Sequence, residues 1–237
     1  PADALVVSLM KGVEKNSGLR MSQVIAEAGI DASRIVVISG PNLAAEIAAE
    51  QPAASVAASA SLDSAKLVAS ASSNSYFTTF TNTDVIGTEF GGILKNLIAV
   101  AIGIVNGVGY GQNTKASIMT RGVSEISRFA VAFGAKPKTM VGLAGLGDLI
   151  ATSESPLSRN HKAGEMLGKG YSKREVLARL SQTAEGLASV STILELARAK
   201  GISMPIVEQV ELVIEGKMSP KDIAPHLTHE TEEPQGE

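Results

Sequence analysis

The sequence predicts an α/β region followed by an all-helical region, because the spacing of apolar residues changes near Asp84. Before this residue, short β-branched runs end at glycines and alternate with helical spacing, a pattern typical of a doubly wound parallel sheet. After it, long stretches with helical periodicity dominate and few runs resemble strands. We therefore expect two domains, at 1–84 and 85–227, and a disordered acidic tail at 228–237.

The first domain should contain buried strands connected by helices. The runs at 4–9 and 34–39 are apolar and partly β-branched, as in buried parallel strands. A helix at 21–28, which stops at Gly29, should connect them. Further elements are expected as a helix at 43–50, a strand and helix within 57–72, and a last strand at 77–80. This set resembles the closing half of a doubly wound sheet without its opening βαβ unit.

The second domain should consist of helices alone. Their expected positions are 86–105, 114–133, 159–168, 173–180, 188–199 and 205–215, with a short last helix after Ser219-Pro220. The most apolar stretch, Leu97 to Val105, is too short to span a bilayer and is better interpreted as a core helix. We expect no membrane insertion and no signal peptide.

The composition excludes several kinds of site. The chain has 237 residues and a net charge of -3, so it offers no broad basic surface for nucleic acid or anionic membranes. It has no cysteine, which excludes disulfides and thiolate chemistry and favours a reducing cytoplasm. Three histidines are too few for a histidine-rich metal site. Binding of a phosphate-bearing ligand must therefore depend on a local cluster.

Lys95 lies in an apolar helix and has no carboxylate one turn away on that helix. A lysine that extends from a buried helix to solvent would fit this pattern. A lysine in a low-dielectric cleft would fit it as well, and its pKa would fall toward the range useful for proton transfer. Gly91 and Gly92 before it, and Asn96 beside it, favour the second interpretation, because glycines let a ligand or a second backbone approach.

A glycine-rich turn at 142–147 leads to Asp148. An aspartate after glycine is often only a helix N-cap. Alternatively, Asp148 lies opposite Lys95, holds its ammonium and accepts a substrate hydroxyl. The spacing does not choose between these two interpretations.

Ser158-Arg159-Asn160 precedes a run with helical spacing. With Ser158 as N-cap, the free backbone N–H groups, the helix dipole and the guanidinium of Arg159 could together hold a phosphate. The alternative is a solvated basic turn.

Two predicted strands end in candidate binding residues. Lys11 follows the first strand, and Ser39-Gly40-Pro41-Asn42 follows the second. Ligands of open parallel sheets bind at the carboxyl ends of strands, so the position favours function. A lysine and a turn without a ligand are the alternative.

Taken in order, these motifs resemble bacterial NAD(P)-dependent glycerol-3-phosphate dehydrogenase. The resemblance extends from about Leu5 to Ile223. It rests on the segments 8–14, 39–41, 92–96, 109–122, 145–149, 158–160 and 185–186. It implies a truncated Rossmann domain followed by an all-α domain of the 6-phosphogluconate dehydrogenase C-terminal-like type.

The resemblance also implies an activity and its residues. The reaction is the reversible NAD(P)H-dependent reduction of dihydroxyacetone phosphate to sn-glycerol 3-phosphate, which feeds glycerophospholipid synthesis. Lys95, as proton donor and acceptor, and Asp148 would be catalytic. The substrate would be bound by Lys11, Gly40, Asn42, Lys95, Asp148, Ser158, Arg159 and Asn160. The cofactor would be bound by Lys11, Ala44, Arg159, Thr183 and Glu185. A homodimer is the default oligomer, and no metal is expected.

Three features depart from the family pattern. No G-x-G-x-x-G motif occurs in the required strand-turn-helix context, so we expect this chain alone to bind cofactor poorly and to be inactive. Asn42 replaces the usual Ser or Thr, and Thr183 replaces an aliphatic residue. The preference for NAD or NADP stays open. Two other hypotheses are a related β-hydroxyacid or 6-phosphogluconate-type dehydrogenase, and a catalytically silent helical module for oligomerisation or phosphometabolite binding.

Overall fold

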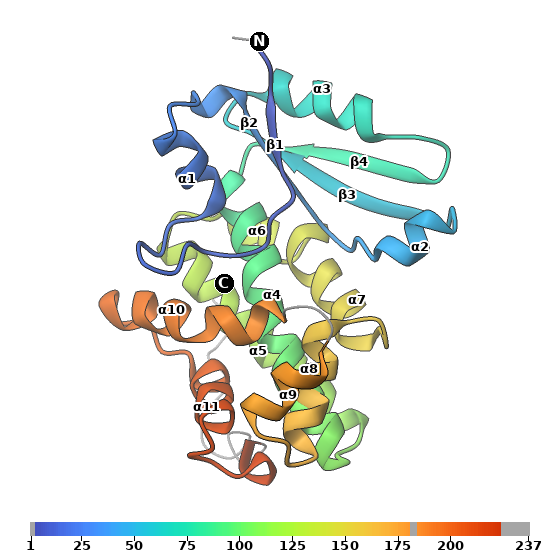
Figure 1. The fold of residues 1–237 in the computed structure, drawn as a ribbon. Helices are drawn as coiled ribbons and strands as arrows, with labels where there is room; N and C mark the ends of the chain where they lie inside the picture. The colour runs from blue at the N-terminus through green and yellow to red at the C-terminus, as the bar shows by residue number, and fades with distance from the viewer. Residues whose placement is uncertain (1–2, 181–183, 224–237) are drawn as a thin grey trace, which may run out of the picture.

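The computed structural model describes residues 3–180 and 184–223. Figure 1 shows a small sheet with flanking helices at one end of the molecule and a group of helices at the other. The expected acidic tail at 228–237 and the site residue Thr183 lie outside the described residues.

The sheet has four strands in the order β1-β2-β3-β4. They are β1 (Val6–Ser8), β2 (Ile35–Ser39), β3 (Ala53–Ala58) and β4 (Phe77–Asn82). The helices of this region are α1 (Met21–Glu27), α2 (Ala44–Ala48) and α3 (Leu62–Ser72), with a 3-10 turn, η1, at Ala32–Arg34. The strands and α-helices match the expected ones to within a few residues at their ends, whereas η1 was not expected.

The sheet is mixed rather than wholly parallel. β1 pairs with β2, and β3 with β4, in parallel, but β2 pairs with β3 antiparallel, with Val37 opposite Ala58. The expectation of parallel strands throughout is wrong for this one pair. A parallel return needs a crossover along the face of the sheet, usually a full helix. The segment 40–52 contains only the five-residue helix α2, whereas the eleven-residue α3 carries the chain from β3 to β4.

The helical region is built around α4 (Val85–Val108). Its N-cap is Asp84, whose carboxylate accepts hydrogen bonds from the backbone N–H groups of Gly87 and Lys136, both at 2.8 Å. Every residue from Gly87 to Val105 is buried, and the larger hydrophobic core surrounds this helix. By length and composition α4 could cross a membrane, but 83% of its apolar window is buried inside the fold. Burial in the protein therefore accounts for its apolar character.

The other helices pack around α4 (Figure 1). They are α5 (Gln112–Ala132), α8 (Arg159–Gly168), α9 (Lys173–Arg179), α10 (Glu185–Ala199), α11 (Pro205–Ile214) and the 3-10 turn η3 (Pro220–Ile223). All were expected from the apolar spacing. Three further elements were not: α6 (Pro137–Met140), the π-helical turn η2 (Leu143–Gly147) and α7 (Asp148–Glu154). The glycine-rich segment was interpreted as a turn, whereas it forms η2 and continues directly into α7.

A buried carboxylate joins the two regions. Glu89 on α4 accepts hydrogen bonds from the backbone N–H of Ser22 at 2.8 Å and from its hydroxyl at 2.5 Å, and it forms an ion pair with Arg20. Both partners lie at the start of α1, beside the sheet. A buried charge is stabilised only when it is paired and hydrogen-bonded, as here. This contact fixes the start of α1 against the helix that carries Lys95.

α4 and α8 cross with backbone in direct contact. A Cβ atom on Gly164 of α8 would lie 2.1 Å from the carbonyl oxygen of Val100, and one on Gly103 would lie 2.2 Å from the carbonyl oxygen of His161. Only glycine permits such an approach. The crossing therefore fixes the first turn of α8 relative to α4.

We expect Gly164→Ala to destabilise the protein by about 1–3 kcal/mol or more, because the methyl group overlaps the backbone of α4. Alanine is otherwise the better helix former by about 1 kcal/mol, so the clash decides the sign. Urea unfolding followed by circular dichroism measures the change. Gly12→Ala is the matched control, since a Cβ there meets nothing within 4 Å. Equal or greater stability of Gly164→Ala would contradict the packing argument.

Candidate active site

A cavity of about 460 Å³ lies between the carboxyl ends of β1 and β2 and the helices of the second region. It brings together eight of the residues singled out from the sequence: Lys11, Asn42, Ala44, Lys95, Ser158, Arg159, Asn160 and Glu185. Gly40 and Asp148 do not line the cavity but contact Lys11, which does.

Asp148 holds two ammonium groups. Its Oδ2 lies 2.5 Å from Nζ of Lys11, and its Oδ1 lies 3.0 Å from Nζ of Lys95. Lys11 also donates a hydrogen bond to the carbonyl oxygen of Gly40 at 3.0 Å. The side chains of Asp148 and Lys95 are only 3% and 7% exposed. Asp148 is the first residue of α7 but makes no capping hydrogen bond there, so the N-cap interpretation is wrong.

Thr152 completes this cluster and was missed from the sequence. It lies one helical turn after Asp148 on α7. Its hydroxyl accepts a hydrogen bond from Nζ of Lys95 at 2.5 Å and donates one to Oδ1 of Asp148 at 3.1 Å. The spacing of four residues from Asp148 was the available signal, but it has meaning only once α7 is known to be a helix.

Burial lowers the pKa of Lys95 from 10.5 to about 8. The largest cause is the loss of hydration around the ammonium, which disfavours the charged form. The carboxylate of Asp148 opposes this effect, and the positive charge of Lys11 adds to it. Lys95 can therefore gain or lose a proton near physiological pH.

Two consecutive glycines let this cluster form. A Cβ on Gly92 would lie 2.5 Å from Oγ of Ser39, and one on Gly91 would lie 2.4 Å from the carbonyl oxygen of Ala144. The end of β2 therefore contacts α4 at Gly92, and the glycine-rich segment before α7 contacts it at Gly91. These two contacts bring Lys11 and Asp148 close to Lys95, so that Asp148 contacts both ammonium groups.

The first turn of α8 opens onto the same cavity. Ser158 is its N-cap and accepts a hydrogen bond from the backbone N–H of His161 at 3.2 Å, as expected. Arg159 follows and lines the cavity. Asn160 accepts a hydrogen bond from the backbone N–H of Gly186 at 2.9 Å, which fixes α8 against the start of α10. At that start, Glu185 accepts a 3.4 Å hydrogen bond from the side chain of Asn96.

Two buried polar atoms near the cluster have no hydrogen-bond partner among the described residues. They are Oγ of Ser39 and Oδ1 of Asn42. Asn42 lines the cavity and donates a hydrogen bond from its amide nitrogen to Ser55 at 3.1 Å. Buried polar groups normally have partners, so the unpartnered oxygen of Asn42 at the cavity indicates a site for a polar ligand.

The described ranges 3–180 and 184–223 contain no group of three His, Asp or Glu side chains that could hold a metal ion. The charged side chains that line the cavity are those of Lys11, Lys95, Arg159 and Glu185.

The chain matches two family models. Residues 84–225 match the NAD-dependent glycerol-3-phosphate dehydrogenase C-terminus, and residues 1–65 match the NAD-dependent glycerol-3-phosphate dehydrogenase N-terminus. A protein of Leifsonia xyli named glycerol-3-phosphate dehydrogenase [NAD(P)+] is 65% identical over 98% of this chain. A protein of the same name from Thermobifida fusca is 49% identical over 87% of it. The aligned parts span 63% and 62% of the lengths of these two relatives.

Solved structures of proteins with the same name have a similar fold. The crystal structure of glycerol-3-phosphate dehydrogenase from Coxiella burnetii has 34% sequence identity and a TM-score of 0.85, covering 95% of this chain and 69% of that one. The yeast glycerol-3-phosphate dehydrogenase structure has 27% identity and a TM-score of 0.84, covering 97% of this chain and 69% of that one. With a family model that matches more than half of its residues, the chain belongs to the NAD-dependent glycerol-3-phosphate dehydrogenase family.

Proposed function

We propose that the complete gene product catalyses the reversible NAD(P)H-dependent reduction of dihydroxyacetone phosphate to sn-glycerol 3-phosphate. The observation that carries the proposal is the buried contact of Lys95 with Asp148 and Thr152, at a cavity whose far wall is the first turn of α8. The names of the relatives support the same reaction.

Reduction of a ketone needs a hydride at carbon and a proton at oxygen. The nicotinamide cofactor, when bound, supplies the hydride. Negative charge then develops on the C2 oxygen of the substrate, and the ammonium of Lys95 stabilises that charge and donates the proton. In the oxidation direction the neutral amine accepts the proton. A pKa of about 8 suits both roles, because it lies near the working pH.

Asp148 and Thr152 orient the ammonium of Lys95 through the contacts described above. Asp148 also holds Lys11. In this proposal Asp148 further accepts a hydrogen bond from the substrate hydroxyl. Lys11 carries a second positive charge to the cavity from the end of β1. Holding the amine in one orientation matters because proton transfer needs hydrogen-bond distance to the reacting oxygen.

The substrate phosphate is assigned to the first turn of α8. Free backbone N–H groups at a helix N-terminus favour an anion, and the guanidinium of Arg159 adds a charged donor. Ser158 and Asn160 line the same part of the cavity. Gly40 and Asn42, at the end of β2, complete the substrate site in this proposal. The unpartnered oxygen of Asn42 supports a ligand there.

The cofactor site would use the sheet side of the cavity. Lys11, Ala44, Arg159 and Glu185 would hold NAD(P)H, and all four line the cavity. Thr183, assigned to the same group, lies outside the described residues. The amide oxygen of Asn42 lines the same cavity beside Ala44 and has no hydrogen-bond partner among the described residues, so the residues present fit a polar group there.

The wider setting is also proposed. The product would feed glycerophospholipid synthesis in the cytoplasm, and the protein would form a homodimer without membrane insertion or nucleic-acid binding. Residues 1–84 and 85–227 would be separate domains, in accord with the N-cap at Asp84.

Lys95→Met should lower kcat by about a hundredfold to ten-thousandfold, because it removes the proton donor. Methionine has similar length and suits a buried helix, so the thermal unfolding temperature should not fall. NADH and NADPH oxidation with dihydroxyacetone phosphate, followed by absorbance, measures the rate. Lys66→Met, at a lysine whose side chain is 62% exposed, is the charge-matched control. A near-normal rate in the folded Lys95→Met protein would show that Lys95 is not the proton donor.

The pH dependence should have opposite signs in the two directions. Reduction needs protonated Lys95, so its kcat/KM should fall as pH rises through about 8. Oxidation needs the neutral amine, so its kcat/KM should rise over the same interval. Initial rates measured between pH 6 and 10 at constant ionic strength test this. The absence of an inflection near pH 8 in both directions would count against Lys95 as the proton-transfer group.

A further inference from the structure

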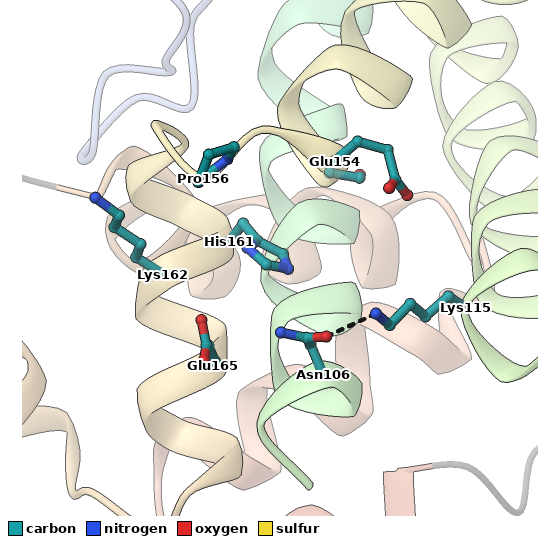
Figure 2. A pocket seen from close by; sticks show the side chains of 8 residues that line it. Asn106, Lys115, Glu154, Pro156, His161, Lys162 and Glu165 are labelled. Atoms are coloured by element: carbon teal, nitrogen blue, oxygen red, sulfur yellow. Dashed lines mark hydrogen bonds between the residues drawn. The ribbon is translucent and has the colours of Figure 1, made fainter. Parts of the chain in front are cut away.

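A second cavity of about 300 Å³ lies beside α7, α8 and the segment that connects them (Figure 2). It shares no lining residue with the candidate active site. On α7, Thr152 lines the active-site cavity, and Ser153 lines the second one. On α8, Asn160 lines the first and His161 the second. The same two elements therefore form a wall of both cavities.

Ser153 presents a buried hydroxyl that no group of the described chain satisfies. The residue is 2% exposed, and its Oγ has no hydrogen-bond partner. A buried hydroxyl without a partner is unfavourable, because it has lost its hydrogen bonds to water. An unpartnered donor and acceptor that lines a cavity indicates a polar occupant.

Two opposite charges face this cavity without being paired to each other. Lys115 on α5 donates a hydrogen bond to Oδ1 of Asn106 at 2.6 Å, a neutral partner. Within the part of the chain that the structure describes, neither Lys115 nor Glu154 forms a salt bridge. Figure 2 shows both side chains extending into one space, across which the ring of His161 and the amide of Asn106 lie.

The remaining charges at the rim do not change this balance. Glu165 is paired with Lys169 at 2.5 Å, and Lys162 points away from the centre of the group in Figure 2. Burial lowers the pKa of His161 below 6.5, so its imidazole is neutral at pH 7 and can both donate and accept a hydrogen bond. The centre of the cavity thus offers the ammonium of Lys115, the carboxylate of Glu154 and several neutral hydrogen-bonding groups, while Lys162 and Glu165 also line it.

We propose that this cavity is a second binding site, for a small zwitterion of the amino-acid type. The ligand carboxylate would contact the ammonium of Lys115, the amide nitrogen of Asn106 and the hydroxyl of Ser153. Its ammonium would contact Glu154. A simple anion would meet Lys115 but would also face Glu154, which disfavours it. The volume lies at the lower end of the range for ligand pockets and suits a molecule of this size.

Binding can be measured without reference to the dehydrogenase reaction. L-amino acids with uncharged side chains are titrated one at a time into the complete gene product by calorimetry at fixed ionic strength. For the best ligand, two analogues follow: the acid without the amino group and the amino acid amide. We expect one site per chain, with each analogue at least about tenfold weaker, because each loses a charged hydrogen bond.

Three variants test whether the ligand binds in this cavity. Ser153→Ala removes only the unpartnered hydroxyl, and Lys115→Met and Glu154→Gln each remove one charge. Each should weaken binding by about tenfold or more. Lys66→Met on α3 should leave it unchanged. Binding that persists in all three variants, equal affinity for the amino acid and its des-amino analogue, or no binding by any amino acid would overturn the proposal.

Discussion

The structure depends on one buried carboxylate that serves two ammonium groups. Burial of Lys95 is unfavourable for its charged form, and Asp148 reduces that penalty without removing it. Because Lys11 shares the same carboxylate, neither lysine has Asp148 to itself. The result is a buried amine at the cavity whose pKa is lowered to about 8. The proposed chemistry follows from this balance.

The rest of the fold brings distant segments to this point. Glycines on α4 let the end of β2, the turn before α7 and the backbone of α8 approach the helix within contact distance. Glu89 on the same helix fixes the start of α1 through Arg20 and Ser22. A larger residue at Gly91, Gly92 or Gly103 would displace one of these segments. Close packing around one buried helix is thus a condition for the site and not only for stability.

The sequence predicts much of this arrangement and misses what depends on local detail. Apolar spacing located the strands and the long helices, and the ordered motifs located eight of the fifteen residues that line the cavity. The sequence did not show that β2 and β3 are antiparallel, because a buried strand has the same apolar pattern in either direction. It also missed α7, since glycines before Asp148 indicated a turn. Without α7, Thr152 and Ser153 could not be assigned to opposite cavities.

The pKa of Lys95 tests the central claim most directly. A trace amount of acetylating reagent reacts only with the neutral amine of Lys95. The extent of acetylation, measured by mass spectrometry across a pH series, therefore reports the fraction of neutral amine. The account predicts a midpoint near 8 in the native protein, and a lower one in Asp148→Asn, because the opposing carboxylate is gone while the burial remains. A midpoint near the ordinary value of 10.5, or one that Asp148→Asn does not change, would contradict it.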